Sequence, residues 1–187
     1  MRQFTVFAES LTEHMLKNGA RMHDFAAAYV SSRAHVGLPS VSVEDIVYAR
    51  AVEIVAERMR RVDLLTGRDV AAAVRGTKSE VKRVERQRQF DELVKAIVLQ
   101  VNRNGETYRV DAEMENRASA FEGKPHTPVD SMMTRLALQH VLPRVSTSAL
   151  TSQDVQTAAR VAGQRVVLSF SASQDGALNR GHRRSAV

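Results

Sequence analysis

The sequence predicts an all-α protein built from two similar helical halves. Helices are favoured because only four Pro and nine Gly occur among 187 residues, 5% of the residues are aromatic, and Trp is absent. Apolar residues recur at helical spacing through most of the chain. The halves are indicated by a motif that occurs twice, as Leu65-Thr66-Gly67-Arg68-Asp69-Val70 and as Leu150-Thr151-Ser152-Gln153-Asp154-Val155, with equivalent residues 85 positions apart.

This repeated motif is typical of a helix start. Thr66 and Thr151 each supply an N-cap hydroxyl, and the Asp three positions later closes a box-like cap at the positive end of the helix. The Leu before each Thr can form the outer half of a hydrophobic staple. We therefore expect Thr66, Asp69, Thr151 and Asp154 to cap the last helix of each half.

The first half, residues 1–76, is expected to contain four helices. Apolar spacing predicts them over residues 4–17, 22–33, 43–62 and 66–75. Asn18-Gly19 predicts the end of the first helix, because Asn and Gly commonly terminate helices. Gly37 and Pro39 predict a break over residues 35–43.

The second half repeats this order after a separating stretch at residues 76–79. A basic connector helix is expected over 77–89, continuous with an apolar helix that reaches residue 101. Asn104-Gly105, 86 positions after Asn18-Gly19, predicts its end. A helix over residues 110–121, a break over 122–129, a helix over 130–143 and the capped last helix are then expected. Residues 166–170 either extend that last helix or form a short strand. The second half thus covers 90–170, and 171–187 is expected to be a flexible basic tail.

Charge is unevenly distributed along the chain. The net charge is +6, and residues 77–101 and 171–187 contribute +2 each, whereas the two longer remaining stretches contribute +1 each. Arg outnumbers Lys by 22 to 5, and the Arg guanidinium is the better fork for phosphate. A basic balance suggests an acidic partner. The alternative interpretation is that the charge serves only to keep the protein in solution.

Signatures of enzymes are absent from the sequence. Cys is absent, which excludes thiolate chemistry and favours an intracellular or virion-interior location over secretion. We find no zinc-protease, phosphate-loop, dinucleotide or nucleophile-elbow motif, and the six His never fall at metal-ligand spacing. His140 is expected to be a core or interface side chain. We therefore expect no enzyme, no cofactor, no metal and no membrane partner, and a small-substrate enzyme is only a third hypothesis.

A family resemblance rests on both halves. The residues that carry it in the second half are Phe90, Leu93, Val94, Lys95, Ile97, Arg109, Asp154-Val155-Gln156, Ala158, Arg160-Val161, Gly163 and Arg165. They resemble the larger histone of the pair that builds the central histone tetramer. Gly19, Arg21 and the motif at 66–70 resemble its smaller partner. Residues 4–165 are thus similar to a histone doublet, the fused core histones of some giant viruses.

The resemblance implies a fold for each half, and the sequence differs from histones at several positions. Each half would run short helix, long central helix, short helix, with the long helix interrupted at the Gly/Pro breaks. Histones present a basic residue and Thr to DNA just before the last helix, whereas Asp63-Leu64 and Ser148-Ala149 stand here. The Arg that clamps the cap Asp in histones is replaced by Val62 and Thr147.

The function implied is the compaction of double-stranded DNA without sequence readout, through Arg in the minor groove and helix ends on phosphates. The expected DNA-binding residues are Arg21, Arg58, Arg60, Arg61, Lys78, Lys82, Arg83, Arg86, Arg88 and Arg109. The expected partners are duplex DNA and other histone-fold chains or a second copy, in a nucleus, nucleoid or virion interior. The alternative is a helical structural or assembly protein, such as a virion or phage component, without direct DNA binding.

Overall fold

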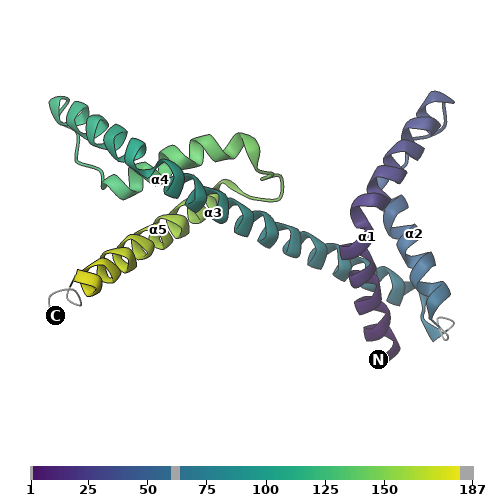
Figure 1. Cartoon of the computed structure of the whole chain (residues 1–187). Helices are drawn as coiled ribbons and strands as arrows, with labels where there is room; N and C mark the ends of the chain where they lie inside the picture. The colour runs from purple at the N-terminus through teal and green to yellow at the C-terminus, as the bar shows by residue number, and fades with distance from the viewer. Residues whose placement is uncertain (1, 60–63, 182–187) are drawn as a thin grey trace. The chain divides into compact units, whose positions relative to one another are not determined.

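The chain folds into helices, with no strand in the part that the structure describes. A computed structural model gives the backbone of residues 2–59 and 64–181 and the side chains of residues 3–59 and 64–166. The elements are α1 (Arg2–His35), α2 (Val43–Arg58), α3 (Gly67–Phe121), α4 (Val129–Val141), the 3-10 helix η2 (Leu142–Arg144) and α5 (Ser152–Gly181) (Figure 1). The prediction of an all-α fold is confirmed for these residues.

Two compact units divide the chain, Met1–Val84 and Glu85–Val187. Unit 1 contains α1, α2 and the first part of α3, and unit 2 contains the rest of α3 with α4, η2 and α5. The division falls within the predicted connector helix, 77–89, which is not a separate element but a stretch of α3.

Unit 1 is held together by an apolar face that α1 presents to α2. Phe7 and Leu11 of α1 are fully buried, and Val47 and Ala51 of α2 pack in the same core. Burying a Leu or Phe side chain completely contributes about 1.5–3 kcal/mol relative to exposure. Ala73 anchors the start of α3 in this core.

Unit 2 has its own core, built from α3, α4 and α5. Leu93 and Ile97 of α3 are fully buried, and Ala137 of α4 and Ala158 of α5 meet them. The small side chains on α5 allow its backbone to approach closely: a Cβ added at Gly163 would lie 3.2 Å from the Thr134 hydroxyl oxygen of α4.

The predicted helix end at Asn18-Gly19 is wrong, whereas Asn104-Gly105 lies at a kink where two helical segments meet. α1 continues through Asn18-Gly19, and the expected helices 4–17 and 22–33 are one helix. In α3, Asn104 leaves the helical region (φ −125°, ψ 17°), so the predicted helix end at Asn104-Gly105 is seen as a kink between two helical segments of α3. The Ala-rich residues that follow each pair favour helix, and the Asn18 and Asn104 amides donate back to the carbonyls of His14 and Gln100, four residues earlier.

The helices end instead at the next Gly of each half, where the Gly/Pro breaks were predicted. Gly37 has φ +71° and Gly123 has φ +70°, a conformation that a side chain disfavours. Leu38 N donates to Arg33 O at 3.2 Å, and Lys124 N donates to Ser119 O at 3.0 Å, so both ends share a Schellman-type bond. The predicted break at 35–43 is seen over residues 36–42, and the predicted break at 122–129 over residues 122–128.

The expected separation at residues 76–79 is also absent, since α3 runs through it. Thr77 is 1% exposed and its hydroxyl lies 3.0 Å from that of Thr12 on α1. This contact and the packing of Ala73 offset the cost of about 1 kcal/mol for Gly76 in a helix interior. The short capped helix and the basic connector therefore form one element.

Two further helix ends differ from the prediction. α2 stops at Arg58, four residues before the predicted end at residue 62. The backbone of 166–170 is helical, so this segment extends the last helix rather than forming a strand. α5 reaches Gly181, so residues 171–181 of the predicted tail are helical; 182–187 lie outside the described residues.

Candidate nucleic-acid interface

Both copies of the repeated motif form the same hydrogen bonds. The Asp69 carboxylate accepts from Thr66 N at 2.9 Å and from the Thr66 hydroxyl at 2.7 Å, and the Asp154 carboxylate accepts from Thr151 N and its hydroxyl, both at 2.8 Å. Asp69 N and Asp154 N donate in return to the Thr hydroxyls, at 3.3 and 3.2 Å. These bonds lower the pKa of Asp69. Both motifs therefore start helices with a reciprocal cap.

The Arg86 side chain of α3 clamps the second cap. Its guanidinium donates two hydrogen bonds to the Asp154 carboxylate, at 2.8 and 2.7 Å, and this parallel geometry is the strongest form of ion pair. The hydrogen bond from Arg86, followed by those from Thr151, lowers the pKa of Asp154 well below its usual range. Arg86 was expected to contact DNA, and here it holds the start of α5.

Four other expected DNA-binding residues are engaged with carboxylates as well. The ion pairs are Lys78 with Glu44 and Asp45 at 3.6 and 3.4 Å, Arg83 with Glu80 at 2.6 Å, Arg88 with Glu85 at 2.8 Å, and Arg109 with Glu106 at 2.7 Å. The carboxylates raise the pKa of Arg83, Arg88 and Arg109. These cations are neutralised locally, so they contribute less to an anion-binding field than the sequence indicated.

Of the remaining expected residues, Arg21, Arg58 and Lys82 are exposed and form no ion pair within the described parts of the chain. Arg21 lies beside His14 on α1, and the charge of Arg58 on α2 helps to lower the pKa of His14, after burial. Arg60 and Arg61 lie outside the described residues. The expected set is therefore dispersed over α1, α2 and α3 rather than gathered into one site.

The structure presents a basic stripe that the sequence interpretation did not propose. It consists of Arg68, Arg75 and Lys82, seven positions apart on α3, all exposed and none in an ion pair among the described residues. A spacing of seven places side chains on one helix face, and this face is opposite the buried Ala73 and Thr77. The stripe spans about 21 Å at 1.5 Å per residue.

A helical projection would have found the stripe. In the sequence, Gly76 suggests a helix that ends at Arg75, and such an end separates Lys82 from Arg68 and Arg75. Once α3 is continuous, the three cations fall on one line. Ser79, also exposed, lies between two of them and offers no competing charge.

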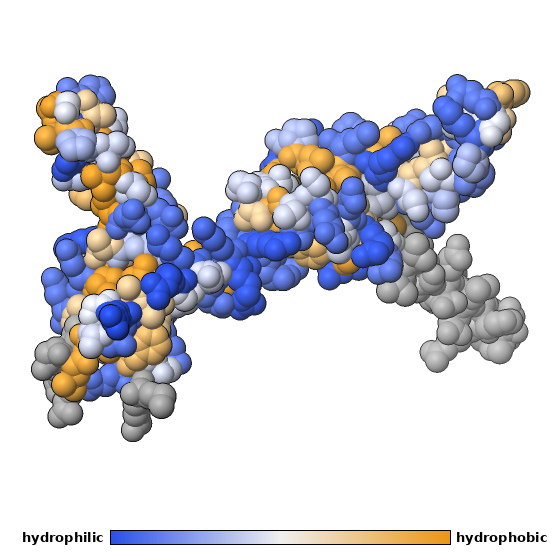
Figure 2. Space-filling view, turned by 180° about the vertical axis from the view of Figure 1, so that it is seen from behind, coloured by the Kyte–Doolittle hydropathy of each residue, from blue (hydrophilic) through white to orange (hydrophobic). Residues whose placement is uncertain are grey.

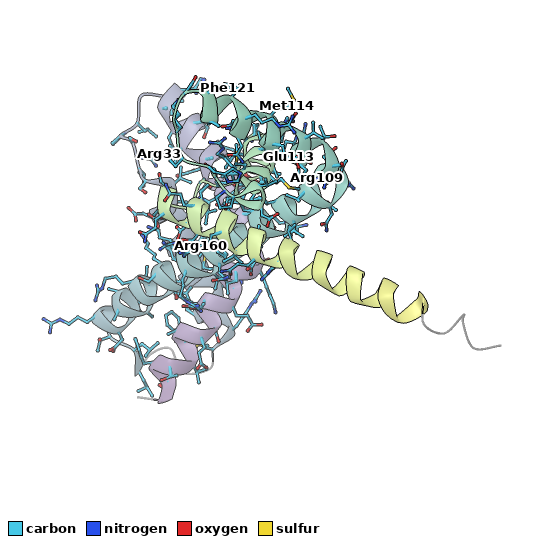
Figure 3. The ribbon with its side chains drawn as sticks, turned by 90° about the vertical axis from the view of Figure 1, so that its left-hand side faces the viewer. Arg33, Arg109, Glu113, Met114, Phe121 and Arg160 are labelled. Atoms are coloured by element: carbon cyan, nitrogen blue, oxygen red, sulfur yellow. The ribbon has the colours of Figure 1, made fainter. Side chains whose placement is uncertain are left out.

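Among the grooves on the described surface, one in each unit includes Arg side chains. The larger, about 800 Å³, lies between α4 and α5 and includes Arg135 and Arg160. The other, about 610 Å³, lies between α1 and α2 and includes Arg21, Phe25 and Tyr29. The α1–α2 groove is lined mostly by apolar side chains, whereas most residues that line the α4–α5 groove are polar or charged. Figure 3 labels Arg160 on α5.

The described residues were compared with the side-chain sets that hold metal ions in proteins. No cluster of three or more His, Asp or Glu side chains there could hold a metal ion. The His140 ring stacks on the Tyr108 ring with centroids 5.9 Å apart, so it is a packing side chain on the surface of α4. Within the described chain, no helix has the length and apolar character needed to cross a bilayer.

Comparison of the chain with protein-family models, curated proteins and solved structures found no match.

Proposed function

We propose that this chain is a non-enzymatic architectural protein, a tandem of two helical repeats that binds the backbone of duplex DNA without reading its sequence. The basic stripe on α3 is the observation that carries this proposal. Its three unpaired cations keep their charge available, unlike Arg83, Arg88 and Arg109. Lys and Arg that neutralise phosphates supply most of the affinity of sequence-independent binding.

The tandem repeat is supported by features that recur 85 or 86 positions apart. They include the caps at Thr66 and Thr151, the left-handed glycines at 37 and 123, and the Asn18 and Asn104 side-chain bonds. Each unit then consists of a long first helical segment, a short second helix and a capped third helix. Caps and turns that arose independently in the two units would not be expected to recur at one common spacing.

A histone doublet is the form of this architecture that the sequence resemblance favours. The Arg86–Asp154 pair supports it, because the cap Asp of α5 is clamped by an Arg as in histones, although this Arg comes from α3 and not from the loop position that Thr147 occupies. The helix lengths differ from the expectation, since α1 has no break at Asn18 and ends at His35, and α3 has only a kink at Asn104 and ends at Phe121. The proposal therefore relies on the repeated caps and the clamp rather than on helix lengths.

Salt dependence of binding to a random-sequence duplex tests the proposal. The slope of log K against log salt is about −0.9 for each phosphate neutralised, so the triple variant Arg68→Gln, Arg75→Gln, Lys82→Gln is expected to lose about 2.7 from the slope. Fluorescence anisotropy with a labelled duplex at several salt concentrations measures it.

The matched control removes three paired cations, as Arg83→Gln, Arg88→Gln, Arg109→Gln, and changes the net charge by the same amount. We expect it to retain most of the slope of the unmodified chain. A flat slope for the unmodified chain would overturn DNA binding. A larger loss in the control than in the stripe variant would instead assign binding to the cations expected from the sequence.

A helical assembly protein without direct DNA contact is the second candidate. Large apolar side chains that face solvent favour it, with Phe25 74% exposed and Phe121 94% exposed. Figure 2 shows apolar surface at the end of α1 that is farthest from the N-terminus. Light scattering with and without DNA separates the candidates, because only this second function requires assemblies that form equally well without DNA.

A further inference from the structure

His14 is a titratable side chain at the contact between α1 and α2, the two helices that lie side by side in unit 1 (Figure 1). It lines the groove between these helices, next in sequence to the buried Met15. Its side chain is partly buried, and the Nε2 atom is fully buried without a hydrogen-bond partner among the described residues. Buried polar atoms in native structures nearly always have a partner, so this exception needs an explanation.

The Asn18 side chain determines which ring nitrogen of His14 carries the proton. Its amide nitrogen lies 3.3 Å from Nδ1 of His14 and 3.2 Å from the carbonyl oxygen of the same residue. Because an amide N–H group donates and does not accept, Nδ1 is the acceptor and the neutral ring carries its proton on Nε2. A second proton would be added at Nδ1, where it would face the donor group of Asn18. The protonated ring would then have two N–H donors without an acceptor for either one in the folded unit.

The charges around the ring also oppose its protonation. The residues that line the groove come from α1 and α2, and the charged ones besides His14 are Arg21, Arg50 and Glu53. Glu53 is already bound to Arg50 at 2.7 Å, so its carboxylate does not balance a charge on the imidazole. Burial, followed by the charge of Arg58, lowers the pKa of His14. The contacts of the ring and its surroundings therefore both favour the neutral form.

Unit 2 has a residue that does not titrate at the equivalent position. At the offset of 86 that relates Asn18 to Asn104, His14 corresponds to Gln100. Asn104 donates to the carbonyl oxygen of Gln100 as Asn18 donates to that of His14. The Gln100 amide also has a partner of its own, because it donates to the Tyr108 hydroxyl at 2.8 Å. The repeat therefore keeps the Asn contact in both units and has an ionisable ring at this position in only one of them.

We propose that His14 is an acid-sensitive latch: proton uptake by its ring releases α1 from α2 in unit 1, while unit 2, with Gln100, stays folded. In the released state water supplies acceptors for both N–H groups of the ring. The pKa of His14 is lowered by folding, so its contribution to stability is fully present above the unfolded pKa of about 6.5 and is lost as the pH falls towards the folded pKa. The latch concerns the stability of unit 1 and does not depend on DNA binding.

Hydrogen exchange of the full chain at about pH 7.5 and about pH 5, corrected for intrinsic exchange rates, tests the latch. The amides of Val47 and Ala51 report on α2 in unit 1, and the amide of Ala137 reports on α4 in unit 2. Protection in unit 1 is expected to fall at least about threefold at the lower pH, and protection in unit 2 to change by less than about twofold. Carboxylates ordinarily titrate near pH 4, so His side chains are the ones that change charge over this range.

His14→Gln introduces the residue of unit 2 and is expected to remove the loss of protection in unit 1 at the lower pH. His23→Gln is the matched control, because His23 is exposed on the same helix, and it is expected to keep that loss. Titration of the His14 ring in the unmodified chain, followed by NMR, needs no variant to fold and is expected to have its midpoint below 6.5. The proposal is overturned by equal protection of unit 1 at both pH values, by an equal loss in unit 2, by a loss that persists in His14→Gln or disappears in His23→Gln, or by a ring midpoint at or above 6.5.

Discussion

Arg86 and Asp154, which are 68 positions apart in the chain, form a two-bond ion pair that ties α3 to the first turn of α5. The Asp154 carboxylate thereby has two roles, as the acceptor that caps α5 and as the partner of a guanidinium. Its counterpart Asp69 forms the same cap, and no described residue forms an ion pair with it. The two caps therefore have the same hydrogen bonds and differ in the ion pair with Arg86, which only the cap of α5 has.

Removing the clamp is expected to change the pH dependence of stability. The folded-state pKa of Asp154 is depressed, so its contribution is fully present above the unfolded pKa of about 3.9 and is lost as the pH falls through the folded pKa. Arg86→Gln should therefore destabilise the protein at pH 7 and differ less from the unmodified chain as the pH falls below about 4. Urea unfolding followed by circular dichroism measures this. Equal destabilisation at pH 7 and at pH 2.5 would contradict it.

The threonine caps provide a second prediction. Thr66→Ala and Thr151→Ala each remove the hydroxyl that accepts from the Asp backbone N–H, and loss of an N-cap costs about 1 kcal/mol. Thr→Ser at either position keeps the hydroxyl and is expected to lower stability much less. Thermal unfolding measures both. A Ser variant as unstable as the Ala variant would mean that the methyl group, rather than the hydrogen bond, stabilises the helix start.

Gln89 provides a third prediction, in the core of unit 2. It is 2% exposed, its amide donates to the hydroxyls of Ser146 and Ser148 at 3.2 Å, and its carbonyl oxygen accepts from Ala149 N at 2.9 Å. Gln89→Leu leaves these partners without their bonds and is expected to cost about 1–3 kcal/mol. Hydrogen exchange should show faster exchange at the Ala149 amide. Unchanged exchange there would indicate that the loop before α5 is held by other contacts.

These contacts show which parts of the structure local sequence could predict. The caps and the Gly37 and Gly123 breaks were predictable, because each depends on residues within a few positions. The ion pairs of Arg83, Arg88 and Arg109 are also local, since each carboxylate lies three residues earlier, and this spacing on a helix is readable from sequence.

The remaining features depend on contacts between distant segments. Arg86 meets Asp154, and Thr77 meets Thr12 across 65 positions, so neither pair could be inferred from spacing. The Thr77 contact also explains why α3 continues where Gly76 suggested a boundary. The basic stripe depends on this contact as well: the spacing of seven is readable from the sequence, but it places Arg68 and Lys82 on one face only because α3 continues past Gly76.

Glycine-to-alanine substitutions give the last prediction, because they are expected to lower the stability of the protein at two positions and to raise it at a third. Gly37 and Gly123 have positive φ, so Ala at either position is expected to cost about 1–2 kcal/mol through the left-handed backbone. Gly76 lies inside α3 and a Cβ there meets nothing within 4 Å, so Gly76→Ala is expected to stabilise the protein by about 0.5–1 kcal/mol. Thermal unfolding of the three variants measures the effects. Destabilisation by Gly76→Ala would contradict a continuous α3, because only a break at this position would make Gly the preferred residue.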